Sequence, residues 1–365
     1  MHEESITYSQ ASCIMAMFLF GSTLIFGGGI EANRDSWLAL IIAIIMFIPI
    51  SLIYARLVKL FPGKNLFGIL EELFGKIFGK ILGGVFVWYA IYLAASILRN
   101  TTDFIQIAAM PETPQIAVAI LLLAVIAYMV KCGMETFGKW SLVTFIMICI
   151  VVPFTVFISI RSIKWSNLLP IFDNKLGSML KASYRQFSLS FGETVMFLGV
   201  AGSLGKKDSP YKSYFYGILC ASVISIIVIT RDIAVLGPAM IESVCYPAFV
   251  TGRIINPSES FARIESLIGI NYVIASITKM TLCVFVAVKG MASLFNIDDY
   301  KKNVMPICLL CLMLSIISYD SVVDLSESAR NYYPIYAMPF QIFIPLVMWI
   351  TAEIKKSRRN ACGKI

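Results

Sequence analysis

Two charged side chains stand inside long apolar stretches of this chain. Glu193 lies in the run SLSFGETVMFLGVAGSL, and Lys279 lies in NYVIASITKMTLCVFV with Thr278 beside it. An ionisable group in a hydrocarbon environment is costly unless it faces a partner, a cavity or water. Glu193, Thr278 and Lys279 are therefore candidates for ligand binding. The alternative is a position nearer the end of the stretch, from which the charge reaches the interface, above all for Lys279.

Small residues recur in two apolar stretches that lie far apart in the sequence. They are Gly21, Ser22 and Thr23 in FGSTL, and Gly192, which lies between Phe191 and Glu193. Glycine costs about 1 kcal/mol inside a helix and leaves the backbone accessible. Both places are thus candidates for a helix that unwinds around a ligand, as in transporters with broken helices. Close packing of two helices is the alternative for each.

A third apolar stretch offers aromatic and hydroxyl groups. Tyr89 and Leu93 lie one helical turn apart, and Tyr92 and Ser96 occupy an adjacent face. One of these two stripes should line the interior of a helix bundle. We take Tyr89 and Leu93 as candidate ligand contacts, with simple packing as the alternative.

The elements that must position these residues are membrane-spanning helices. The chain is 58% hydrophobic and 14% charged, with a mean hydropathy of +0.81, whereas soluble domains are about 25% charged. About 20 apolar residues cross the hydrocarbon core of a bilayer. Runs of this kind occupy residues 9–30, 36–58, 80–99, 115–131, 138–160, 182–203, 213–235, 271–293, 303–319 and 333–353. The first run carries no cleavage pattern, so we expect a permanent helix and not a signal peptide.

The sequence therefore predicts an all-α membrane protein of about ten transmembrane helices. We expect one permease-like domain over residues 1–365, with five helices in 9–160, five in 182–353 and a basic tail in 354–365. Most of the 30 Lys and Arg residues fall in the inner connections and the tail if the N-terminus is cytoplasmic. Both termini are predicted to be cytoplasmic. The placement of Lys and Arg on the cytoplasmic side accounts for the net charge of +8. No nucleic-acid partner is therefore expected.

The connections between the spans carry further predictions. Residues 64–80 are too charged to span and are apolar on one face, which indicates an interfacial helix on the cytoplasmic side. The outer connections 161–181 and 236–270 contain prolines and should hold short helices or turns. Arg99 and Asp103, four residues apart, should pair at the outer end of the third span.

Enzyme and metal signatures are missing from the sequence. It has one histidine, His2, and no zinc-protease motif, phosphate loop or nucleophile elbow. Most of the nine cysteines lie in apolar runs, and Cys308-x-x-Cys311 has no second pair beside it. We expect no catalytic residue, no metal ligand, no cofactor and no disulfide framework.

Short motifs follow one another along nearly the whole chain. They are FGSTL (20–24), FPGKNL (61–66), P-x-T-P (111–114), CGMETFGKW (132–140), NLLPIF (167–172), FGE (191–193), GKK (205–207) and SFARIESL (260–267). In this order and at these spacings the chain resembles the B subunit of bacterial spore germination receptors. That permease family is a branch of the amino acid, polyamine and organocation transporter superfamily. Lys139 departs from the arginine that the family tends to have, and Gly27–Gly29 replaces its usual proline.

The resemblance implies a LeuT-like fold of two inverted five-helix repeats, with the first and sixth helices interrupted. It also implies residence in the inner spore membrane or cell membrane. The partners would be a membrane-associated A subunit and a lipoprotein C subunit. Such a receptor senses a small nutrient, typically an amino acid, and triggers ion release and germination.

From these features we expect the germinant to bind at mid-membrane. Backbone N–H groups of residues 21–23 would take a carboxylate, and carbonyls near Gly192 would take an ammonium group. Tyr89, Leu93 and Phe191 would shape the side-chain pocket.

Other interpretations of the same residues remain open. Lys279 lies on the helix that in the superfamily helps to form a sodium site, so its ammonium group is a candidate substitute for that ion. A secondary active amino acid transporter of the plasma membrane is the alternative function. An ion channel is a third, because fold does not fix function.

Overall fold

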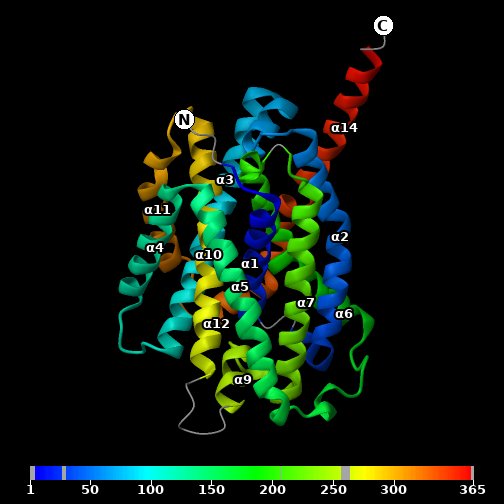
Figure 1. The fold of residues 1–365 in the computed structure, drawn as a ribbon, viewed down its shortest axis with the longest axis vertical. Coiled ribbons are helices and arrows are strands. Elements are labelled where there is room, and N and C mark those ends of the chain that lie inside the picture. Colours follow the sequence, from blue (N-terminus) through cyan, green and yellow to red (C-terminus); the bar gives the residue numbers. More distant parts are fainter. Residues whose placement is uncertain (1–4, 27–29, 206, 256–263, 363–365) are drawn as a thin grey trace.

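The computed structural model describes residues 5–26, 30–205, 207–255 and 264–362, and these residues form a helical bundle (Figure 1). The first five spans correspond to α1 (Tyr8–Phe26), α2 (Ser36–Leu60), α3 (Leu66–Ala108), α4 (Gln115–Cys132) and α5 (Met134–Ser159). The later spans include α7 (Pro210–Leu236), α10 (Ile264–Phe295), α11 (Val304–Ile317) and α14 (Ile344–Cys362). The predicted all-α class is confirmed.

Eight helices of the described chain are long and apolar enough to cross a membrane. They correspond to eight of the ten predicted spans. The other two predicted spans are α1, which has 19 residues, and the sixth span, which is divided into shorter helical pieces. The last span is divided as well, because α13 (Tyr333–Met338) and a π-turn, η8 (Pro339–Phe343), precede α14.

The predicted interruption of the first helix near Gly21 is wrong. α1 is helical through Gly21, Ser22 and Thr23, so the backbone N–H groups of these residues serve the helix. A Cβ at Gly21 would lie 3.1 Å from the carbonyl oxygen of Ala275 and 3.1 Å from the Cβ of Lys279. Gly21 is therefore small because α1 packs closely on α10. The neighbouring Gly27–Gly29 lie outside the described residues.

The predicted interruption of the sixth helix is confirmed. α6 (Leu176–Gln186) passes into a π-turn, η4 (Phe187–Phe191), and then into a 3₁₀ helix, η5 (Gly192–Gly199). The hydrogen-bond pattern thus changes twice within a few residues, which is frequent at functional sites. The second change falls at Gly192, directly before Glu193.

The helix predicted for residues 64–80 is present, but protein and not lipid covers most of its apolar face. α3 begins at Leu66 and is broken at Gly75, whose φ of 80° and ψ of 172° are not helical. Residues 66–74 are thereby separated from the long spanning part. Lys355 of α14 donates hydrogen bonds of 2.8 Å to the carbonyls of Glu72 and Leu73, where this short helix ends. Most of the apolar side chains of residues 66–74 are buried in the core.

Short helices lie in the two connections that we predicted to be outer, as expected; the side of the membrane stays a prediction. They are η2 (Ile160–Ser162) and η3 (Trp165–Leu168) before the sixth span, and α8 (Pro238–Ser243) and α9 (Pro247–Ile255) before α10. A further short helix, α12 (Val322–Asn331), follows α11 and was not expected from the sequence.

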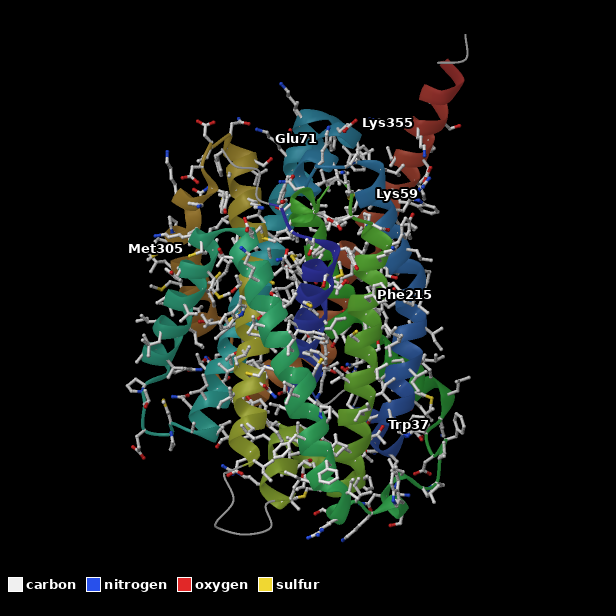
Figure 2. The ribbon with its side chains drawn as sticks, in the orientation of Figure 1. Trp37, Lys59, Glu71, Phe215, Met305 and Lys355 are labelled. Atoms are coloured by element: carbon white, nitrogen blue, oxygen red, sulfur yellow. The ribbon has the colours of Figure 1, made fainter. Side chains whose placement is uncertain are left out.

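α10 and α1 form the centre of the bundle (Figure 1). α10 packs on α3, α1, α4, α5 and α9, and α1 also packs on α5 and α7. The described part of the chain begins and ends at the same end of the bundle. Figure 2 shows Lys59, Glu71 and Lys355 at that end and Trp37 toward the other. The side of the membrane to which this end belongs stays a prediction.

Candidate functional site

A buried ion pair lies where α1, η5 and α10 meet. The Nζ atom of Lys279 donates to the Oε2 atom of Glu193 and to the hydroxyl oxygen of Ser22. The side chains of Lys279 and Glu193 are only 3% and 4% exposed. Burial of two charges is costly, and their mutual contact offsets that cost only with further hydrogen bonds. The structure therefore joins three residues that the sequence analysis selected from three separate helices.

Those further bonds come from the last span and from α3. The hydroxyl group of Tyr333 donates to the Oε1 atom of Glu193. The hydroxyl oxygens of Tyr333 and Tyr89 are 2.9 Å apart. The amide of Gln341 in turn donates to the hydroxyl oxygen of Tyr89 at 2.9 Å and to the carbonyl of Ser188 at 2.8 Å. Glu193 thus joins Lys279 and Ser22 to a continuous polar network that reaches the carbonyl of Ser188.

Gly192 packs against Gln341, a member of this network. A Cβ at Gly192 would lie 2.2 Å from the Oε1 atom of Gln341 and 2.5 Å from its Cδ atom. The hydroxyl group of Tyr54 lies 3.4 Å from the carbonyl oxygen of Gly192 and 2.5 Å from that of Gln341. The carbonyl that we expected to take a ligand ammonium group therefore already faces a protein donor.

A small cavity of about 40 Å³ borders the ion pair, whereas small-molecule sites usually have roughly 300–1,000 Å³. Lys279 and Glu193 are the charged residues among those that line it. The full lining consists of Tyr92, Leu93, Ser96, Ile97, Asn100, Leu189, Glu193, Lys279, Tyr319, Leu325, Ala329 and Tyr333. Because residues 92–100 belong to the later part of α3, the cavity lies in the half of the bundle away from residues 66–74.

The predicted ligand contacts fall into two groups. Leu93, Glu193 and Lys279 line the cavity, and Ser22 and Tyr89 bond to the network behind it. The others lie elsewhere. Thr23 accepts a hydrogen bond of 3.2 Å from Ser225 of α7.

Three more predicted residues likewise contact neighbouring helices. The hydroxyl of Thr278 lies 3.4 Å from the indole nitrogen of Trp140 on α5, and the ring of Phe191 packs 5.6 Å from that of Phe47 on α2. Gly21 contacts α10, as described above. Their roles as ligand contacts stay predictions, and their observed contacts are those of packing residues.

Tyr333, Gln341 and Tyr54 were not predicted from the sequence. Gln341 lies in the apolar run PFQIFIPLVMWI and is fully buried. An amide in such a run must find hydrogen-bond partners, by the same reasoning that selected Glu193. That signal was available in the sequence, whereas nothing in the local sequence of Tyr333 or Tyr54 distinguishes it from the other tyrosines.

The predicted pair of Arg99 and Asp103 is confirmed, with the Arg99 Nε atom 3.1 Å from an oxygen of Asp103. The same guanidinium group donates to the carbonyls of Tyr319 at 2.7 Å and Asp320 at 3.2 Å. These two residues connect α11 to α12, and Tyr319 lines the cavity. Arg99 therefore ties one wall of the cavity to α3.

The described residues contain no group of three or more His, Cys, Asp or Glu side chains that could hold a metal ion. Where α1 meets α10, the structure places the ammonium group of Lys279. Its role as a substitute for a sodium ion stays a prediction.

Comparison with known proteins decides the family. A family model described as spore germination protein matches residues 5–322. The chain belongs to this family. It is 24% identical over 364 residues to spore germination protein KB of Bacillus subtilis (strain 168), which covers 99% of this chain and 98% of the relative. It is 23% identical over 362 residues to spore germination protein XB of Bacillus anthracis, covering 94% and 98%.

Solved structures share the fold at low sequence identity. One is MhsT in complex with L-phenylalanine, with a TM-score of 0.62, 11% identity and coverage of 93% of this chain and 98% of the other. Another is MHP1, a nucleobase-cation-symport-1 family transporter, in a closed conformation with bromovinylhydantoin bound. Its TM-score is 0.62 at 11% identity, with coverage of 96% and 90%. The expected family and LeuT-like fold are confirmed, while the division into repeats at 9–160 and 182–353 stays a prediction.

Proposed function

We propose that this chain is the nutrient-sensing membrane subunit of a spore germination receptor. Its family and its two germination relatives support a role in germination. The observation that carries the sensing role is the Lys279–Glu193 pair in the wall of a cavity between helices. A buried ion pair contributes little net stability compared with well-packed apolar residues, so its presence beside a cavity favours a binding role.

The proposed ligand site is the ion pair together with the cavity, which must widen from its present volume of about 40 Å³ to admit a nutrient. Leu93, Glu193 and Lys279 would contact the nutrient, and Ser22 and Tyr89 would hold the charged groups in place. This arrangement replaces our expectation that the backbone of residues 21–23 binds a carboxylate, because that backbone is engaged in α1. No catalytic residue is assigned, and the role we propose is binding without chemical conversion.

The location and partners form a further part of the proposal. A germination role supports residence in the inner spore membrane and assembly with an A subunit and a lipoprotein C subunit. The end of the bundle that holds Lys355 would face the cytoplasm, and the positive-inside rule supports this orientation. Occupancy of the cavity would then be passed to the partner subunits.

A secondary active amino acid transporter is the second candidate function. The observation that favours it is the shared fold with MHP1, which is named as a transporter. The two functions differ in output, because a transporter must alternate between two open states whereas a sensor must only shift a population between states. Uptake of labelled amino acids by vesicles that contain the purified chain would favour transport.

The decisive experiment uses spores in which other nutrient receptors of this class are deleted. The response of these spores to a panel of amino acids, sugars and nucleosides is measured with and without the gene for this chain. We expect at least one nutrient response to require the gene. Unchanged responses to every nutrient would refute the receptor function.

A further inference from the structure

A second cavity lies away from the ion pair, at the end of the bundle where α1 begins. It has a volume of about 280 Å³, close to the lower limit of roughly 300 Å³ for small-molecule sites. Its lining comes from three helices and consists of Tyr8, Ser9, Ser12, Cys13 and Ala16 of α1, Phe145 of α5, and Tyr216 and Cys220 of α7. In Figure 1, α1 lies between α5 and α7, and both of these helices pack on it. The proposed nutrient site uses none of these residues.

The cavity opens toward the lipid-facing surface of the bundle. Among its lining residues, Tyr8 and Tyr216 are 42% and 46% exposed. The side chains of Ile146 on α5 and Leu219 on α7, each next in sequence to a lining residue, are also exposed and belong to spanning helices. In a chain that spans the membrane, the molecules that reach such an opening are lipids.

The end of the cavity nearest to the membrane surface is polar. Tyr8 and Ser9 are the first two residues of α1 and are exposed. α1 and α7 begin at the same end of the bundle, because Gly217 packs on Ser12 near their starts and Ser225 bonds to Thr23 further along. The start of α7 therefore lies beside Tyr8 and Ser9.

The start of α7 also supplies a positive charge. Lys212, Tyr216 and Cys220 are four residues apart and therefore share one face of the helix. Lys212 is exposed and lies one turn nearer to the start of α7 than Tyr216 does. This spacing places an ammonium group next to the polar end of the cavity, where the head group of a lipid would lie.

The deeper end of the cavity is apolar. Cys13 and Ala16 line it from α1 and Cys220 from α7, and a free cysteine packs as a small hydrophobic residue. The ring of Phe145 stacks on that of Phe20, one turn beyond Ala16, with the ring centroids 6.5 Å apart. Water in this part would find few of the two to four hydrogen-bond partners that it needs. An apolar chain satisfies this end of the cavity better than water does.

We propose that the cavity holds one acyl chain of a phospholipid from the adjoining leaflet. The chain enters between α5 and α7 and ends near the rings of Phe20 and Phe145. Removal of its methylene groups from water is not needed, because they come from the bilayer, so the shape of the cavity and the head group determine the affinity. The ester groups lie at Tyr8 and Ser9, and the phosphate pairs with Lys212, an attraction that is favourable for basic residues near a membrane surface.

This site differs from ordinary lipid contact because the chain touches α1. Ser12 and Cys13 are each 9% exposed, and Ile14 and Met15 are 0% and 1% exposed. Lipid that only surrounds the protein touches the exposed faces of α5 and α7 and reaches none of these four residues. A chain in the cavity reaches Ser12 and Cys13, which line it, and still fails to reach Ile14 and Met15.

The test is photo-crosslinking of the full-length protein in lipid nanodiscs. The discs contain phosphatidylglycerol and phosphatidylethanolamine, with a small fraction of a phosphatidylglycerol that carries a diazirine in the middle of one acyl chain. Adducts are located by peptide mass spectrometry after illumination. We expect adducts on Ser12 or Cys13 at least about tenfold above those on Ile14 and Met15.

A matched pair of variants tests whether the cavity admits the chain. Cys220→Phe fills the cavity and should lower the adducts on Ser12 and Cys13 about tenfold or more. Leu219→Phe places the same side chain on the neighbouring, lipid-exposed position outside the lining, and should leave these adducts unchanged. Adducts on Leu121, which is exposed on α4 far along the chain, should be equal in all variants and show that each is embedded alike.

A second comparison tests the head group. Lys212→Met should lower the adducts on Ser12 and Cys13 about fivefold, whereas Lys131→Met, which removes an exposed lysine from the end of α4, should not. An alkane that carries the same diazirine has no phosphate, and it should label Ser12 and Cys13 about fivefold less than the phospholipid does.

Three results would overturn the proposal. Adducts on Ser12 and Cys13 no higher than those on Ile14 and Met15 would show that no chain enters. Adducts that persist unchanged in Cys220→Phe would show that the chain reaches α1 by another way. Equal labelling by the alkane, together with an unchanged Lys212→Met variant, would assign the cavity to a free apolar molecule and not to a phospholipid.

Discussion

The substitution Gly192→Ala tests how tightly the sixth span packs on the last one. The backbone of Gly192 has a φ of −62° and a ψ of −31°, which alanine adopts without strain. The added methyl group would, however, lie 2.2 Å from the Oε1 atom and 2.5 Å from the Cδ atom of Gln341. Any loss of stability must therefore come from the displacement of that side chain.

The size of the stability loss follows from the hydrogen bonds that Gln341 would lose on displacement. Its amide donates to the hydroxyl oxygen of Tyr89 and to the carbonyl of Ser188, so it cannot withdraw without breaking bonds. Overpacking a core costs about 1–3 kcal/mol, and each lost hydrogen bond costs about 1 kcal/mol. We expect Gly192→Ala to lower the free energy of unfolding by about 3–5 kcal/mol.

The assay is reversible unfolding of the full-length protein in mixed detergent micelles, followed by circular dichroism. The matched control is Gly177→Ala, because a Cβ at Gly177, in α6, meets nothing within 4 Å. Alanine there should be neutral or stabilising by up to about 1 kcal/mol. The variant Gln341→Ala supplies the second side of a double-mutant cycle. In that background Gly192→Ala should cost less than about 1 kcal/mol, because the obstructing side chain is gone.

Either of two results would show that Gln341 does not limit the space at Gly192. One is a Gly192→Ala variant as stable as Gly177→Ala. The other is a cost of Gly192→Ala that stays the same after Gln341→Ala, because that cost would then arise from the backbone and not from the contact. In both cases Gly192 would be better explained by a helix that unwinds around a ligand, which was the first interpretation of the sequence.

The remaining predictions concern three polar contacts. Glu193→Gln alone should lower the free energy of unfolding by about 3–5 kcal/mol, because it leaves the buried charge of Lys279 unpaired. The double variant with Lys279→Met should have a free energy of unfolding within about 2 kcal/mol of that of the unchanged protein. Equal losses of the two variants in chemical unfolding would contradict this. Arg99→Met should speed amide hydrogen exchange in residues 318–331, because the connection from α11 to α12 loses its anchor to α3; unchanged exchange there would count against the anchor. Lys355→Met should speed exchange in residues 66–75 and nowhere in α10, and protection as in the unchanged chain would show that the carbonyls of Glu72 and Leu73 need no partner.

Part of the candidate site was predictable from the charged and polar residues that stand within apolar runs. Glu193 and Lys279 stand out because a charge in an apolar run has to be compensated, whatever the fold. Gln341, a polar amide in an apolar run, could have been identified in the same way. Tyr333 and Tyr54 carry no such signal, because tyrosines are common in membrane helices, where many place the hydroxyl at the interface.

The structural role of glycine was the hardest to infer from the sequence. Gly21 and Gly192 offered the same two explanations, an unwound helix or a close contact between helices. At Gly21 only the contact is present, because α1 continues unbroken against Ala275 and Lys279. At Gly192 both are present, since the helix changes type there and Gln341 occupies the space of a side chain. A local pattern cannot separate these cases, because the deciding atoms belong to a distant helix.

The sequence by itself determined the membrane class, the approximate spans and the two charges that need compensation. These properties depend on local hydropathy and on the free-energy cost of a charge in an apolar environment, and both can be evaluated along the chain. The tertiary structure decided that Glu193 and Lys279 compensate one another, that Ser22 and Tyr333 hold them, and that a cavity borders the pair. Those facts depend on how α1, α10 and the divided sixth and last spans pack together, and packing brings together residues that no sequence spacing relates.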